Sequence, residues 1–202
     1  MSNDSGTTTD PNAGHAELNE LFAEHRGRLR RMIRLRMDRR MQGRVDPSDV
    51  IQETFVEAAQ RYPEYQLQPD VPPFIWLRFL TGQKLVQLQR KHLGAQARYV
   101  NREVSLYRGA MPEATSVALA ARLIGQQTSP SQAIARAELK LRVQQALNNM
   151  DEIDREVLAL RHFEQLTNPE AAEVLGIGHD TCYGRYVRAL KRMKSVLVDV
   201  SE

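Results

Sequence analysis

The sequence predicts an all-α protein of two small helical domains joined by a linker, with a helix-turn-helix in the C-terminal domain. Three observations favour this class: apolar residues recur every three or four positions in both halves, no segment shows a strand pattern, and Gly, Ser, Thr and Pro interrupt the middle. The 202 residues, 42% of them hydrophobic and 26% charged, suffice for one ordinary domain or two small ones. We expect a disordered tail over 1–14, helical domains over 15–93 and 136–202, and a linker over 94–135.

The first domain is predicted to hold three helices. After a polar tail with little to bury, a basic helix begins near His15. The break from Gly43 to Pro47 precedes a second helix, which is apolar on one side and carries an acidic ridge, Asp49, Glu53 and Glu57, on the other. A loop rich in proline and tyrosine, RYPEYQLQPDVPP, then leads to a third helix that starts near Phe74 and ends in basic residues.

Weak periodicity and small polar residues identify the linker, although some helical content is expected around 116–124. The second domain then begins with apolar residues at helical spacing: Leu139, Val143, Ala146, Leu147 and Met150. The acidic residues from Asp151 to Asp154 are placed to cap the next helix, whose inner side holds Val157, Leu160 and Phe163.

The helix-turn-helix is predicted from residue 167 onward. Thr167 stands three residues before Glu170 with Pro169 between them, the pattern of a capping box with proline in the first turn. Gly176 follows the apolar face of this helix, where a left-handed residue permits a sharp turn. The next helix has one apolar stripe, formed by Cys182, Tyr186, Ala189, Leu190 and Met193.

A second face of this last helix is basic, and no acid interrupts the stretch from Thr181 to Val198. Such a run neutralises phosphates and releases their counterions, which indicates DNA binding. The residues best placed to read base edges are the early ones, His179, Thr181, Tyr183 and Gly184. A basic amphipathic helix is also often a plain solvated face, but the helix, glycine turn and helix in this order favour DNA.

Other classes of protein have little support. The single cysteine, Cys182, lies on the apolar stripe and is predicted to be a small buried hydrophobe. No apolar run reaches the length of a membrane span and no signal peptide is evident, so we expect a cytoplasmic protein without membrane contact. The five histidines are scattered, and neither metal-ligand spacing nor a glycine-rich phosphate loop occurs. We therefore expect no metal, no cofactor and no enzymatic activity.

Two blocks of sequence resemble a known family. The stretch ALNNMDEIDREVLALRHFEQLTNPEAAEVLGIGHDTCYGRYVRALKRM resembles the fourth conserved region of bacterial sigma factors, and DPSDVIQETFVEAAQRY with FIWLRFLTGQKLVQLQRK resembles their second region. The similarity is strongest to the small two-domain extracytoplasmic-function (ECF) class of the sigma-70 family. It implies a subunit without catalysis that binds core RNA polymerase, directs it to promoter DNA and initiates transcription. It also implies a monomer when free, with an anti-sigma factor as a possible partner.

The resemblance implies three sets of site residues. The last helix matches the reader of the minus-thirty-five element, so phosphate anchors join the base readers named above: Arg185, Arg188 and Lys191. The second helix matches the element that docks on polymerase, through Asp49, Gln52, Glu53 and Phe55. The loop and third helix match the part that melts the minus-ten element, where unpaired bases stack on aromatic residues; its candidates are Tyr62, Tyr65, Trp76, Lys84, Arg90 and Lys91.

Alternatives stay open for several of these residues. A lone tryptophan that opens an amphipathic helix, as Trp76 does, is more often part of the core than a site. The acidic ridge has the ordinary interpretation of a solvated face. The runner-up function is a helix-turn-helix transcriptional regulator that acts without being a polymerase subunit; it would dimerise on a palindrome and leave the first domain unexplained. Cys182, Tyr183 and Gly184 also depart from the family pattern, so the resemblance does not give the promoter sequence.

Overall fold

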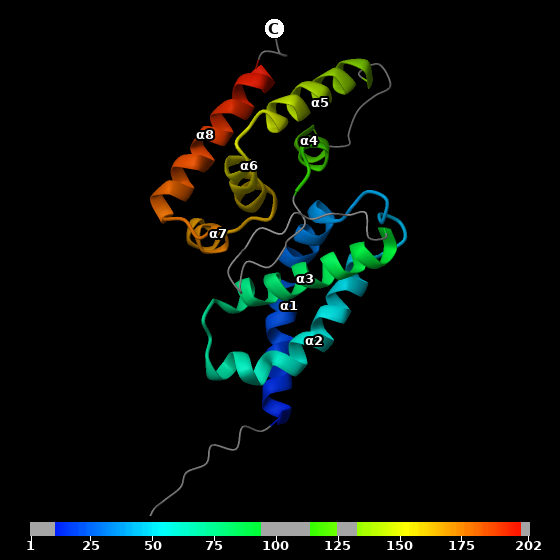
Figure 1. The fold of residues 1–202 in the computed structure, drawn as a ribbon, viewed down its shortest axis with the longest axis vertical. Helices are drawn as coiled ribbons and strands as arrows, with labels where there is room; N and C mark the ends of the chain where they lie inside the picture. Colours follow the sequence, from blue (N-terminus) through cyan, green and yellow to red (C-terminus); the bar gives the residue numbers. More distant parts are fainter. Residues whose placement is uncertain (1–10, 94–113, 125–132, 199–202) are drawn as a thin grey trace, which may run out of the picture.

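The structure is a computed structural model that describes residues 11–93, 114–124 and 133–198. Its elements are α1 (Pro11–Arg36), α2 (Pro47–Leu67), α3 (Pro73–Leu93), α4 (Ser116–Ile124), α5 (Ala133–Asn148), α6 (Glu152–Leu158), the π-helix η2 (Ala159–Phe163), α7 (Asn168–Leu175) and α8 (His179–Val198). Within these ranges the one β-type pairing is an isolated bridge between Gln42 and Val45. The all-α prediction is confirmed (Figure 1).

Helices α1, α2 and α3 pack together as the N-terminal unit. α1 begins at Pro11, four residues before the predicted start, because proline suits the first position of a helix. α2 also begins at a proline, and the side chain of Asp46 caps it by accepting a hydrogen bond from the Ser48 backbone N–H. The fully buried Leu29, Leu77 and other apolar side chains of these helices form the core of the unit.

Helices α4 to α8 form the C-terminal unit. The helical content expected within the linker is α4, which packs on α5 and buries Leu119 and Ala120. These residues join Leu147 and Met150 in one core cluster, so this part of the predicted linker belongs to the C-terminal unit. Residues 133–135, also assigned to the linker, form the start of α5. Residues 94–113 and 125–132 of the predicted linker lie outside the described residues, as do residues 1–10 of the predicted tail.

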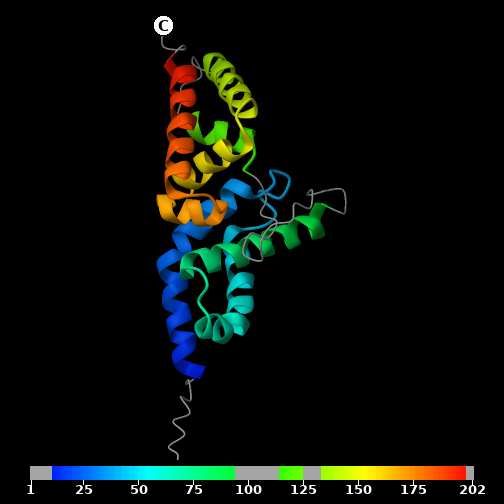
Figure 2. The same cartoon turned by 60° about the vertical axis from the view of Figure 1, so that its left-hand side comes forward.

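The two units pack against each other, as the two views of the ribbon show (Figures 1 and 2). Leu160 of η2 and Leu166 after it are buried in the same apolar cluster as the core of α1, α2 and α3, and Ala171 and Cys182 of the helix-turn-helix belong to that cluster too. In return, Leu35 of α1 is buried in the core of the C-terminal unit. The described residues therefore form a closed arrangement in which the hydrophobic core crosses from one unit to the other.

Candidate nucleic-acid interface

The helix-turn-helix is fixed by local hydrogen bonds. The Thr167 hydroxyl accepts a bond from the Glu170 N–H at 3.4 Å, and the Glu170 carboxylate accepts one from the Thr167 N–H at 2.7 Å, so the predicted capping box is confirmed. Gly176 ends α7 at φ 59° and ψ 43°, the left-handed conformation that the turn requires. The Asn168 side-chain amide donates to the His179 carbonyl at 2.8 Å, which joins the start of α7 to the start of α8.

The two predicted faces of α8 are present in the structure. Cys182, Ala189 and Met193 are buried on one side, with Tyr186 and Leu190 partly buried beside them, which confirms the apolar stripe. Burial raises the pKa of the Cys182 thiol, so this side chain stays neutral in the core. Five other side chains of α8 are exposed to solvent: His179, Thr181, Tyr183, Arg188 and Lys191. We call these five residues, with Gly184, the α8 face.

The structure separates the two arginines that were predicted together as phosphate anchors. The Arg185 guanidinium donates to Asp154 at 2.7 Å and to Asp151 at 3.1 Å, and hydrogen bonding to Asp154 raises its pKa. It thereby clamps α8 to the start of α6, with its side chain only 24% exposed. The Arg188 side chain is 63% exposed and reaches Asp154 only at 3.5 Å. Arg188 is therefore far freer to reach a phosphate than Arg185.

Gly184 lies on the α8 face with open space above it. Apart from the glycine, its two chain neighbours and the nearby backbone of α8, no heavy atom of the described residues lies within 4 Å of the position that a Cβ would occupy there. Its backbone therefore offers a ligand a closer approach than any other residue type would permit.

The predicted melting loop forms a shallow pocket between α2 and α3. The pocket has a volume of about 530 Å³ and is lined by Tyr65, Gln66, Pro69, Asp70, Val71, Pro72 and Pro73. The Tyr65 hydroxyl donates to the Val71 carbonyl at 2.7 Å and so ties the end of α2 to the loop. This bond and the three prolines give the pocket a preformed wall.

Three aromatic residues behind this pocket stack on one another. The Tyr65 and Trp76 rings lie 4.5 Å apart at 16°, and Tyr62 lies 6.2 Å from Tyr65. Tyr62 and Trp76 are buried, which agrees with the core interpretation of Trp76, whereas Tyr65 is half-buried and lines the pocket. Base contact by Tyr62 or Trp76 would require this stack to open.

The cations predicted near the minus-ten site have different surroundings. Lys84 is paired with Glu57 of α2 at 3.2 Å, so it joins α3 to α2. Arg90 and Lys91 are exposed in the last turn of α3, where positive charge also complements the helix dipole. The structure thus leaves Arg90 and Lys91 available to a polyanion and engages Lys84 internally.

The predicted polymerase-docking residues do not all share one face. Asp49, Gln52 and Glu53 are exposed on α2, but Phe55 turns inward and meets the Phe22 ring edge to face at 5.1 Å. Val56, which was not predicted, is 61% exposed. It follows Asp49 by seven residues and Gln52 by four, a spacing that places all three on one helix face and that the sequence already contained. We call Asp49, Gln52, Glu53 and Val56 the α2 face.

The chain is similar to known proteins. Residues 140–193 match the family model described as Sigma-70, region 4. The RNA polymerase sigma factor CnrH of Cupriavidus metallidurans is 30% identical over 158 residues, which cover 78% of this chain and 76% of CnrH. The solved structure of CnrH in complex with the cytosolic domain of CnrY is 22% identical, with a TM-score of 0.49 over 94% of this chain and 95% of that one. RpoE of Bartonella quintana, solved with the anti-sigma factor NepR, is 17% identical, with a TM-score of 0.43 over 90% of this chain and 94% of that one.

The chain belongs to the bacterial RNA polymerase sigma factors of the sigma-70 family, in the ECF class. Its function is that of a sigma factor, a subunit that binds core RNA polymerase and directs promoter-specific initiation of transcription. Among the residues that the structure describes, no helix is both long and apolar enough to cross a membrane. Over the same ranges, no three His, Cys, Asp or Glu side chains are grouped so that they could hold a metal ion.

Proposed function

We propose that the α8 face reads the minus-thirty-five element. The observation that carries this proposal is the exposure of Tyr183, Arg188 and Lys191 on α8, the second helix of the helix-turn-helix. The capping box of α7 and the turn at Gly176 hold that helix in place. Residues near the N-terminus of the helix contact base edges, and the later cations hold phosphates. Arg185 contributes mainly by clamping α8 to α6.

A second part of the proposal concerns the minus-ten element. The pocket beside Tyr65 receives a base displaced from the duplex, and Arg90 and Lys91 attract the strand that carries it. Stacking on an aromatic side chain contributes about 1–3 kcal/mol per base, which helps to offset the cost of unpairing. The prolines of the loop support this role, because a rigid wall loses little entropy when a base binds.

The α2 face is proposed to dock on core polymerase. Its two carboxylates and one amide surround an exposed valine, and a polar rim around an apolar centre is typical of protein interfaces. The N-terminal unit thus serves polymerase and minus-ten binding, and the C-terminal unit serves minus-thirty-five binding. The protein has no catalytic role of its own in this scheme. CnrH has been solved with the cytosolic domain of CnrY, and we include an anti-sigma partner of this kind in the proposal.

Reconstitution with core RNA polymerase tests the proposal. The purified protein should co-elute with the core enzyme and confer promoter-specific run-off transcription, and it should be a monomer before it binds. A dimer that shifts duplex DNA but ignores polymerase would contradict the proposal and support a regulator that acts on its own.

Arg188→Ala is expected to reduce the salt dependence of DNA binding. Loss of one phosphate contact should lower the slope of log K against log salt by about 1, with the fold unchanged. The matched variant is Arg185→Ala, which should leave the slope nearly unchanged and destabilise the C-terminal unit, because Asp151 and Asp154 each lose their ion pair with Arg185. Fluorescence anisotropy on a minus-thirty-five duplex at several salt concentrations measures both. Equal slopes for wild type and Arg188→Ala would remove Arg188 from the phosphate contacts.

Gly184→Ala is expected to separate stability from DNA binding. Alanine fits the open space without a clash and should stabilise the helix by about 0.5–1 kcal/mol. The added methyl group should nevertheless weaken binding to the minus-thirty-five duplex, because it projects from the proposed contact face. Thermal unfolding measures the gain in stability, and a DNA titration of the same sample measures the loss of binding. Tighter or unchanged DNA binding would show that the backbone at Gly184 does not approach DNA closely.

A further inference from the structure

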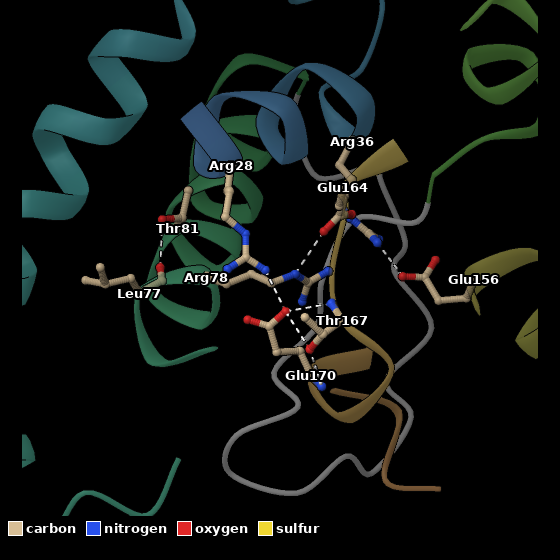
Figure 3. Close-up of polar contacts among 9 residues, drawn as sticks. All are labelled: Arg28, Arg36, Leu77, Arg78, Thr81, Glu156, Glu164, Thr167 and Glu170. Carbon is tan, nitrogen blue, oxygen red and sulfur yellow. Dashed lines mark hydrogen bonds and ion pairs between the residues drawn. The ribbon is translucent and has the colours of Figure 1, made fainter. Parts of the chain in front are cut away.

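A buried carboxylate joins the two units of the protein. Glu164, directly after η2, is 1% exposed and accepts hydrogen bonds from Arg36 of α1 at 2.6 Å and from Arg78 of α3 at 2.9 Å (Figure 3). Arg36 also pairs with Glu156 of α6. Burial alone would raise the pKa of Glu164, but the attraction of Arg36 and Arg78 and their hydrogen bonds outweigh it and lower the pKa. Glu164 is therefore a buried carboxylate ion.

The backbone around Glu164 is unusual and directs the side chain inward. Residues Ala159–Phe163 form a π-helix, and the Glu164 N–H donates to the Ala159 carbonyl at 3.0 Å. The next residue, Gln165, has φ 62°, a left-handed conformation that is strained for a residue with a side chain. π-Helices of this length are rare and are frequent at functional sites. Local strain therefore accompanies the placement of this one carboxylate between two arginines.

A second carboxylate links the units beside the helix-turn-helix. Glu170, which completes the capping box of α7, accepts a hydrogen bond from Arg28 of α1 at 2.7 Å (Figure 3). The Arg28 guanidinium also lies over the Phe74 ring, 3.5 Å from its centroid. Burial alone would raise the pKa of Glu170, but the hydrogen bonds from Arg28 and from the Thr167 N–H have the larger effect and lower this pKa. The Glu170 carboxylate thus caps the first helix of the DNA-binding motif and also pairs that helix with α1.

The closed arrangement is too small for the proposed function. Elements about 25 base pairs apart are separated by about 85 Å of B-form DNA at about 3.4 Å per base pair. In the closed arrangement α1 and α8 measure about 39 Å and 30 Å at about 1.5 Å per residue, so even the two helices placed end to end would span only about 70 Å. The α8 face and the pocket beside Tyr65 cannot reach both elements of straight DNA while the units stay packed together.

We propose that Glu164 and Glu170 form a carboxylate clasp that holds the free protein closed and must release before both promoter elements are bound. The need for release rests on the proposed function, because it assumes that both promoter elements are bound. The clasp itself is a property of the free chain. The closed state also carries a desolvation cost, because Arg78 Nη2 is buried with no hydrogen-bond acceptor among the described residues. This cost and the strain at Gln165 oppose the apolar burial that also joins the units, and they reduce the net free energy of closure.

The distance between the two units in the free full-length protein tests the clasp. Spin labels on Gln60→Cys of α2 and Lys194→Cys of α8, both exposed positions, in a Cys182→Ala background report that distance by pulsed electron spin resonance. Wild type should give one short distance. Glu164→Gln and Glu170→Gln should each raise the fraction of longer distances at least about threefold, and the double variant should raise it further than either single variant. The matched control is Asp154→Asn, which removes a charge from an ion pair within the C-terminal unit and should stay closed.

Each outcome decides for or against the clasp. Unchanged distances in the folded double variant, or equal opening by Asp154→Asn, would overturn it. If Glu164→Gln loses its helical circular dichroism, Glu170→Gln decides, because glutamine is also accepted at that position of a capping box. Binding to core polymerase and to forked promoter DNA is measured separately. If the variants open but the protein binds neither polymerase nor promoter DNA, the clasp is supported and the proposed function is refuted. If the protein binds both but the variants do not open, the proposed function is supported and the clasp is refuted.

Discussion

Replacing Arg36 by alanine is expected to destabilise the protein by about 3–5 kcal/mol, the usual cost of removing one partner from a buried ion pair. The Arg36 side chain is 1% exposed, and it serves the carboxylates of both Glu164 and Glu156. Burial alone would lower its pKa, but these two carboxylates raise it, so the guanidinium stays charged. Without Arg36, the buried Glu164 loses one of the two ion pairs recorded for it among the described residues and keeps the pair with Arg78. Urea unfolding followed by circular dichroism measures the loss.

The matched control for this variant is Arg40→Ala, which removes the same side chain from a surface pair. Arg40 bonds to Asp38 with 68% of its side chain exposed, and such pairs contribute about 0–1 kcal/mol. A loss below about 1 kcal/mol for both variants would show that the buried pairs contribute no more than a surface pair does.

Glu53→Lys is expected to lower the affinity for core polymerase by at least about tenfold, because a reversed charge replaces attraction with repulsion at a docking surface. Glu53 is exposed, so the free energy of unfolding should hardly change. Titration of labelled core enzyme, together with thermal unfolding of the free protein, separates binding from stability.

The control for Glu53→Lys is Glu24→Lys, a charge reversal at an α1 carboxylate whose side chain is 71% exposed. It changes the net charge equally but lies outside the α2 face. Normal polymerase affinity for Glu53→Lys, or an equal loss for both variants, would move the docking surface elsewhere.

Local signals in the sequence predicted the helix-turn-helix well. The capping box at Thr167, the turn at Gly176 and the buried stripe that includes Cys182 each depend on residues within a few positions, where spacing and backbone preference decide the structure. The helix around 116–124 was expected for the same reason. Its packing on α5, which places part of the predicted linker inside the C-terminal unit, has no local signal.

The charged contacts between the units could not be predicted from the sequence. Glu164 meets Arg36 and Arg78 across 128 and 86 residues, and nothing in the spacing of an acidic residue identifies such partners. The π-helix moves Glu164 off the register that α-helical periodicity assigns to it. Arg185 was grouped with Arg188 because both belong to a basic run. In the structure Arg185 pairs closely with Asp151 and Asp154, whereas Arg188 reaches Asp154 only at 3.5 Å.

The aromatic stack beside the pocket contains an intrinsic fluorophore. The chain contains a single tryptophan, Trp76, and its ring lies 4.5 Å from Tyr65, whose side chain lines the pocket. Intrinsic tryptophan emission from the unmodified protein therefore comes from this one place. A base that enters the pocket and disturbs Tyr65 would change that emission, so strand capture can be followed in real time without any added fluorophore.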